Sequence, residues 1–137
     1  MNSNHEVVTI ATHSDGYFEN LINNKYTKVK VLGMGKKWTG FKLKSELVYD
    51  YIKDFPDNKI IIVIDGFDTV INGNINNAIK IFKKQNNKVL ISIDPKNNYK
   101  TSLGQLKGKI LKQFNFFGYC KNNLSLNAGL YMGYVKY

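Results

Sequence analysis

The feature that most restricts the fold of this chain is the apolar stretch Lys59 to Ile64, which runs directly into Asp65-Gly66-Phe67-Asp68. Its sequence, KIIIVI, is rich in β-branched residues, which is typical of a strand buried on both faces of a parallel sheet. In α/β domains the turns that follow such strands carry ligand-binding groups. The stretch therefore predicts a central strand with a polar turn at its carboxyl end.

The rest of the chain alternates between strand-like and helix-like hydrophobic patterns. Short β-branched runs predict strands, and apolar residues spaced three and four apart predict helices. The predicted strands are 7–12, 27–32, 59–64, 88–93 and 126–137, and the predicted helices are 17–22, 42–55 and 75–82, with a further helix expected within 103–114. Ser14 or Asp15 is expected to cap the first helix. The alternation predicts one α/β domain over residues 1–137, with a mainly parallel sheet and ligands at the carboxyl ends of its strands.

Asp65 and Asp68 are the clearest candidates for chemistry. Two carboxylates three residues apart, on the turn after a buried strand, can converge on one hard cation. Mn²⁺ and Mg²⁺ take oxygen ligands and bridge diphosphate oxygens. The alternative is an Asx-type turn whose side chains only satisfy backbone donors.

The net charge of +10 comes from lysine alone, because the 20 Lys+Arg residues include no arginine. Recognition of base edges and bidentate phosphate binding both favour arginine, and the lysines are spread along the chain. We therefore expect a solvated basic surface and no specific nucleic acid as partner. Attraction to an anionic small ligand or an acidic surface is the alternative.

No apolar run reaches the roughly 18 residues that a membrane-spanning helix needs. The N-terminus also lacks the basic start and the long apolar run of a signal peptide. These observations predict a soluble, cytoplasmic protein with no membrane partner. The single cysteine, Cys120, cannot form an internal disulfide and is expected to pack as a small apolar side chain.

The segment KIIIVIDGFDTVINGN resembles the donor-binding motif of the collagen-modifying glycosyltransferases. These include the glycosyltransferase domain of procollagen lysyl hydroxylases and the related procollagen galactosyltransferases. Three further segments are similar to that family, namely VVTIATHSDGYFENL, VKVLGMGKKWTGFKLKSELVYDYI and LNAGLYMGYV. The resemblance runs from about Val7 to Val135 and is weak between Asp94 and Asn123. It implies a GT-A-like, Rossmann-type fold, UDP-glucose or UDP-galactose as donor, Mn²⁺ or Mg²⁺, and transfer to hydroxylysine or galactosyl-hydroxylysine of a collagen-like acceptor.

The resemblance also implies a role for individual residues in binding the nucleotide sugar. Asp65 and Asp68 would hold the metal, Trp38 and Phe67 would face the uracil ring, Thr12 would line the uridine pocket, Lys44 would contact the donor phosphates, and Asn127 and Gly129 would lie near the sugar or acceptor. Stacking of a base on aromatic rings contributes roughly 1–3 kcal/mol. Packing roles for Trp38 and Phe67, a surface role for Lys44 and a strand-end role for Asn127 are the alternatives.

The chain departs from the family pattern in two places. The family's domain continues beyond its Asn-x-Gly strand with acidic residues and a histidine that completes the metal site. Its glycine-rich loop is shortened here to Thr39-Gly40-Phe41-Lys42-Leu43. We therefore expect a fold that is incomplete at the C-terminus, weak or absent transfer, and some self-association through an open strand edge. Three functions stay open: a UDP-sugar-dependent glycosyltransferase, a catalytically inactive remnant that at most binds UDP-sugar, and a basic interaction protein.

Overall fold

The computed structural model describes residues 4–94 and 125–137. Strands and helices alternate from the first strand to the fourth, as the sequence predicts, and their ends differ from the predicted ones by a few residues. In chain order they are β1 (His5–Ile10), α1 (Phe18–Ile22), β2 (Val29–Leu32), α2 (Phe41–Ile52), β3 (Ile60–Asp65), α3 (Ile75–Lys84), β4 (Val89–Asp94) and β5 (Ser125–Tyr134). The helix expected within 103–114 and the packing of Cys120 lie outside the described residues.

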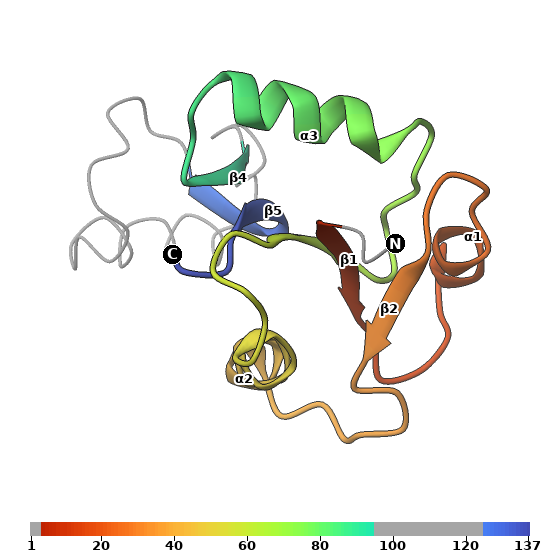
Figure 1. Ribbon diagram of the computed structural model, residues 1–137. Helices are drawn as coiled ribbons and strands as arrows, with labels where there is room; N and C mark the ends of the chain where they lie inside the picture. The colour runs from red at the N-terminus through yellow and green to blue at the C-terminus, as the bar shows by residue number, and fades with distance from the viewer. Residues whose placement is uncertain (1–3, 95–124) are drawn as a thin grey trace. The chain divides into compact units, whose positions relative to one another are not determined.

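The five strands form one sheet with the order β2-β1-β3-β5-β4 (Figure 1). β1 pairs in parallel with both of its neighbours, so that Val7 lies opposite Val29 of β2 and opposite Ile62 of β3. β5 pairs with β3 in the antiparallel direction, with Met132 opposite Ile62. The predicted α/β fold class is therefore confirmed, as a mixed sheet whose core is parallel and which is consistent with a GT-A-like domain.

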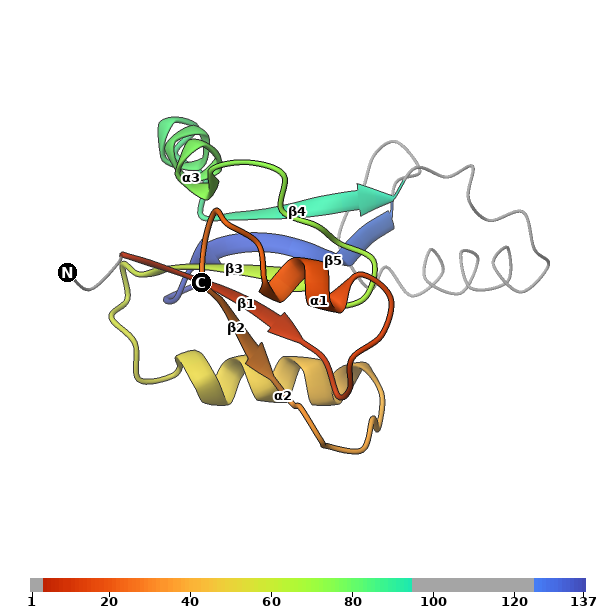
Figure 2. The same cartoon turned by 90° about the vertical axis from the view of Figure 1, so that its right-hand side faces the viewer.

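Helices cover both faces of this sheet, with α2 on one side and α3 on the other (Figure 2). Successive residues of a strand point to opposite faces. Ile62 accordingly packs in a cluster with Leu21 of α1 and Phe82 of α3, whereas Val63 packs in a second cluster with Val48 of α2. Burial on both sides explains why β3 is apolar at every position before its final aspartate.

The first helix, α1, begins without a side-chain cap. Its N-cap residue is Tyr17. Asp15 Oδ1 instead accepts a hydrogen bond of 2.7 Å from the Gly16 N–H, and Ser14 Oγ donates one of 2.8 Å to Glu19 Oε1. The prediction that Ser14 or Asp15 caps this helix is therefore wrong, because the Ser14 hydroxyl bonds the Glu19 carboxylate and the Asp15 carboxylate bonds the Gly16 N–H, so neither side chain accepts a hydrogen bond from a backbone N–H of α1.

The contacts divide the described residues into two units, of which the first comprises residues 4–90 and 129–137 and the second comprises residues 91–94 and 125–128. The first unit contains β1, β2, β3 and the three helices.

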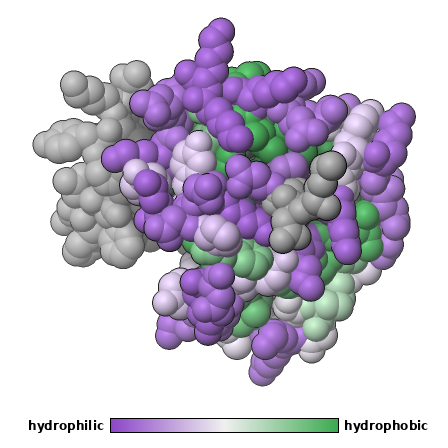
Figure 3. Space-filling model, in the orientation of Figure 1, coloured by the Kyte–Doolittle hydropathy of each residue, from purple (hydrophilic) through white to green (hydrophobic). Residues whose placement is uncertain are grey.

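Hydrophilic side chains, coloured purple, cover much of the face in view (Figure 3), in keeping with the net charge of +10. Within the described ranges, none of the helices has the length and apolar character needed to cross a bilayer.

Candidate functional site

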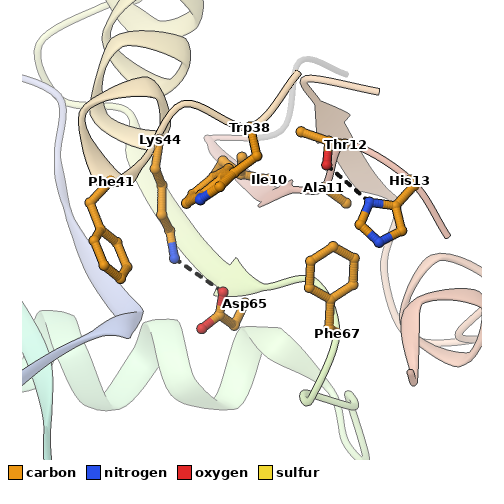
Figure 4. Close-up of a pocket in the computed structure, with 9 residues that line it drawn as sticks. All are labelled: Ile10, Ala11, Thr12, His13, Trp38, Phe41, Lys44, Asp65 and Phe67. Carbon is orange, nitrogen blue, oxygen red and sulfur yellow. Dashed lines mark hydrogen bonds and ion pairs between the residues drawn. The ribbon is translucent and has the colours of Figure 1, made fainter. Parts of the chain in front are cut away.

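A cavity of about 320 Å³ lies at the carboxyl ends of β1 and β3. This is the edge of a parallel sheet at which α/β domains bind ligands. The walls come from the end of β1 with the loop after it, the connection from β2 into α2, the start of α2, and the end of β3 with its following turn (Figure 4). The lining residues are Ile10, Ala11, Thr12, His13, Trp38, Phe41, Lys44, Asp65 and Phe67. The volume falls at the lower end of the range for small-molecule sites, about 300–1,000 Å³.

A charged pair lies in the wall of this cavity. Lys44 Nζ, from α2, is 3.2 Å from Asp65 Oδ1 at the end of β3 (Figure 4). The Lys44 side chain is 10% exposed, whereas the Asp65 side chain is 43% exposed. Lysine is seldom buried to this degree without a partner, because its ammonium group loses hydration. Asp65 therefore compensates the charge of Lys44, and the surface-lysine alternative does not fit Lys44.

Aromatic rings line the rest of the cavity from two sides. Trp38 lies between β2 and α2, is 47% exposed, and meets the Phe41 ring edge-on with centroids 6.1 Å apart. The His13 and Phe67 rings are 5.1 Å apart and lie across the cavity from Phe41 (Figure 4). An indole exposed to this extent is available to a ligand, which argues against a core-packing role for Trp38.

The turn after β3 is held against the loop after β1. The Tyr17 N–H donates a hydrogen bond of 2.7 Å to the Phe67 carbonyl oxygen. Gly16 has a φ of 54°, and a Cβ at this position would overlap the same carbonyl oxygen. At Gly66 a Cβ would lie 3.0 Å from the Ile10 carbonyl oxygen. The placement of Phe67 thus depends on a glycine in each of the two segments.

Five of the eight residues assigned from the sequence meet in the cavity, namely Thr12, Trp38, Lys44, Asp65 and Phe67. Asp68 lies on the same turn but is exposed and is not part of the lining, and its Oδ1 accepts a hydrogen bond of 3.4 Å from Thr69 Oγ1. Asn127 and Gly129 are half-buried in β5. Asn127 belongs to the second unit, where its carbonyl oxygen accepts a hydrogen bond of 3.1 Å from Ser92 Oγ.

Two further lining residues, His13 and Phe41, had no role in the sequence-based assignment. His13 Nδ1 lies 3.0 Å from Thr12 Oγ1. Its position directly after a strand-end residue was a usable signal, because residues at the carboxyl ends of parallel strands face the ligand edge. No comparable signal pointed to Phe41, since its contact with Trp38 depends on how α2 enters the fold.

One side chain at this edge has the chemistry to bind a divalent cation. Asp65 presents a partly exposed carboxylate to the cavity, and carboxylate oxygens are ligands that Mn²⁺ and Mg²⁺ accept. The described residues contain no group of three or more His, Cys, Asp or Glu side chains that could hold a metal ion. Of the two aspartates, Asp65 lines the cavity and Asp68 does not, so a cation beside Asp65 would need to take most of its ligands from a diphosphate and water, as nucleotide-bound Mg²⁺ does.

The fold is an α/β domain with a cavity at the carboxyl ends of its parallel strands β1 and β3. The chain matches the family described as PLOD GT domain over residues 1–137, and it belongs to that family. It is also similar to the human protein procollagen-lysine,2-oxoglutarate 5-dioxygenase 2, with 30% identity over 103 residues. This match covers 64% of the chain and 14% of the human protein, so the chain corresponds to a small part of that relative. The protein is thus a glycosyltransferase-like domain related to collagen lysyl hydroxylases, which confirms the family expected from the sequence.

Proposed function

We propose that this domain binds a UDP-sugar together with a divalent cation, Mn²⁺ or Mg²⁺, and acts as a glycosyltransferase. The observation that carries the proposal is one cavity that combines the Asp65 carboxylate, the buried Lys44 ammonium and the exposed Trp38 indole. A nucleoside diphosphate has a matching group for each of them. Its base can stack on the indole, its phosphate oxygens can accept hydrogen bonds from the ammonium, and its bound cation can take the carboxylate as a ligand.

Each residue then has a defined task in holding the donor. Trp38 and Phe67 hold the uracil ring, Thr12 contacts the uridine, Lys44 contacts the phosphates, Asp65 and Asp68 hold the cation, and Asn127 and Gly129 contact the sugar or the acceptor. The cation supplies charge neutralisation to the nucleoside diphosphate as it leaves the sugar. The surrounding apolar residues, such as Ile10 and Ala11, exclude water and strengthen these electrostatic interactions.

Membership of the family supports a proposal for the donor sugar and the acceptor. UDP-glucose and UDP-galactose are the donors proposed, and hydroxylysine or galactosyl-hydroxylysine in a collagen-like peptide is the acceptor. Support comes from the family match over residues 1–137 and from the similarity to a protein named for procollagen lysine. A form of the domain that binds the donor without transferring the sugar is the second proposal, and a transfer assay separates the two.

The binding proposal is tested by calorimetry with UDP, in the presence of Mn²⁺ and in the presence of a chelator. UDP should bind more tightly with Mn²⁺, and Asp65→Asn combined with Asp68→Asn should abolish the difference. The matched control is Asp54→Asn combined with Asp57→Asn, which removes the same charge from two exposed residues outside the cavity lining. If the double variant at Asp65 and Asp68 binds Mn²⁺ and UDP as the wild type does, these residues do not hold the cation.

The catalytic proposal is tested by incubating the domain with UDP-glucose or UDP-galactose, Mn²⁺ and a hydroxylysine or galactosyl-hydroxylysine peptide. A glycosylated peptide detected by mass spectrometry would establish transfer. Binding of UDP without product would support the donor-binding form. Absence of both binding and product would refute each of these functions.

A further inference from the structure

Lys44 is proposed above to contact the donor phosphates and Asp65 to hold the cation, yet Lys44 Nζ and Asp65 Oδ1 are paired here at 3.2 Å. We propose that Lys44 couples the binding of the divalent cation to that of the diphosphate by exchanging its partner. Lys44 holds Asp65 when no donor is present. When both ligands bind, Asp65 passes to the cation and the Lys44 ammonium passes to the phosphate oxygens. This inference rests on the proposed function and concerns how that site is controlled.

The burial of the two side chains is the first argument. The Lys44 side chain is 10% exposed, and among the described residues Asp65 is the partner with which it forms both a hydrogen bond and an ion pair. Removing the counter-charge from a buried ammonium is strongly unfavourable. A cation that captured Asp65 alone would leave Lys44 in that condition and would also add positive charge beside it. The domain should therefore bind Mn²⁺ weakly in the absence of nucleotide.

The nature of the second ligand completes the argument. A diphosphate carries negative oxygens that accept hydrogen bonds from an ammonium group, so it can replace Asp65 as the partner of Lys44. Lysine suits this exchange because its charge is compact and its side chain is long and flexible. The diphosphate supplies the counter-charge that Lys44 loses when Asp65 binds the cation. The cation in turn supplies the counter-charge that Asp65 loses when Lys44 binds the diphosphate. The two ligands should raise each other's affinity by the same factor, as thermodynamic linkage requires.

Lys42 provides a comparison within the same helix. It lies in the first turn of α2, its side chain is 87% exposed, and its Nζ pairs with Glu46 Oε1 at 3.3 Å. It carries the same charge as Lys44 but is not among the residues that line the cavity. Lys42→Met therefore shows how the loss of a positive charge from α2 changes the affinities for Mn²⁺ and UDP when the Lys44 partner exchange is kept.

The test compares the wild type with Lys44→Met, Lys44→Gln and Lys42→Met. Electron paramagnetic resonance of free Mn²⁺ gives the Mn²⁺ affinity without nucleotide, and calorimetry gives the UDP affinity with and without Mn²⁺. In the wild type, Mn²⁺ should raise the UDP affinity by about 5- to 150-fold. Lys44→Met should bind Mn²⁺ alone several-fold more tightly, bind UDP with Mn²⁺ more weakly, and show a smaller coupling factor than the wild type, the remainder coming from direct coordination of the diphosphate by the cation. Lys42→Met should behave as the wild type does.

Lys44→Gln guards against a folding defect, because it removes the charge but keeps a hydrogen-bond donor, and thermal unfolding checks both variants. The proposal is overturned if Mn²⁺ alone binds Lys44→Met and Lys44→Gln no more tightly than the wild type. It is also overturned if the coupling factor stays unchanged. In either case UDP still binds the wild type with Mn²⁺, so the proposed function stands. If the wild type binds neither Mn²⁺ nor UDP, the proposed function itself fails and the coupling fails with it.

Discussion

Replacing Trp38 by alanine separates a ligand-binding role of this indole from a packing role. Trp38 is 47% exposed, and its ring partner Phe41 is 75% exposed. An edge-to-face aromatic pair contributes about 0.5–1.5 kcal/mol, and a pair this well hydrated belongs at the lower end of that range. The free energy of unfolding should therefore fall by less than about 1 kcal/mol. Stacking on uracil contributes about 1–3 kcal/mol, so the Kd for UDP should rise roughly 5- to 150-fold.

The assay measures two quantities in the same variants. Calorimetry with UDP and Mn²⁺ gives the Kd, and urea denaturation gives the free energy of unfolding. Tyr49→Ala is the matched control, because Tyr49 is a 66% exposed aromatic residue of α2 that is not part of the cavity lining. It should leave the Kd unchanged. A Trp38→Ala protein that unfolds at much lower urea yet binds UDP normally would refute the reasoning, since that result places the indole in the core.

Two further predictions concern the backbone near the site and the response to pH. Gly16→Ala should lower both stability and UDP affinity more than Gly35→Ala does. Both glycines have positive φ, but a Cβ at Gly16 would overlap the Phe67 carbonyl oxygen, whereas the space at Gly35 is open. Equal losses in urea unfolding and calorimetry would show that backbone strain alone is responsible. At the other end of β1, burial lowers the pKa of His5 below its ordinary value of 6.5, against an opposing effect of Glu6. As the pH falls, His5 therefore takes up a proton in the unfolded chain before it does so in the folded protein. The contribution of neutral His5 to the free energy of unfolding is complete above pH 6.5 and is lost as the pH falls through the lower pKa of the folded state. Urea unfolding between about pH 7 and about pH 5 should show a steeper loss of stability for the wild type than for His5→Gln, and parallel profiles would contradict this assignment.

The partner-exchange proposal and the Trp38 prediction address different parts of one ligand. Trp38 acts on the base, so Trp38→Ala should weaken UDP binding to a similar extent with Mn²⁺ and with a chelator. Lys44 acts between the cation and the phosphates, so its variants should change the ratio of those two affinities. The pattern across the two sets of variants therefore tests whether one cavity holds both ends of the nucleotide.

Local sequence was sufficient to place the described strands and helices to within a few residues and to predict the edge of the sheet at which the cavity lies. Burial on both faces requires β3 to be apolar at every position before its final aspartate, and a helix packed on one side requires apolar residues at helical spacing. Both requirements are visible as patterns within a few residues, which is why Lys59 to Ile64 predicted β3 so closely. The aspartate that ends this strand was likewise predicted at the carboxyl edge, since parallel strands present their ends to ligands.

The tertiary structure decided how distant segments meet. The antiparallel direction of β5 beside β3 leaves no mark in either strand's own pattern, because alternation and burial look the same in both directions. The partner of Lys44 is 21 residues further along the chain, and only the packing of α2 against the sheet brings its ammonium to Asp65. The same packing adds Phe41 to the cavity lining. The sequence by itself therefore identified five of the residues that line the cavity, and the fold determined which side chains contact one another, because those contacts depend on the placement of whole elements.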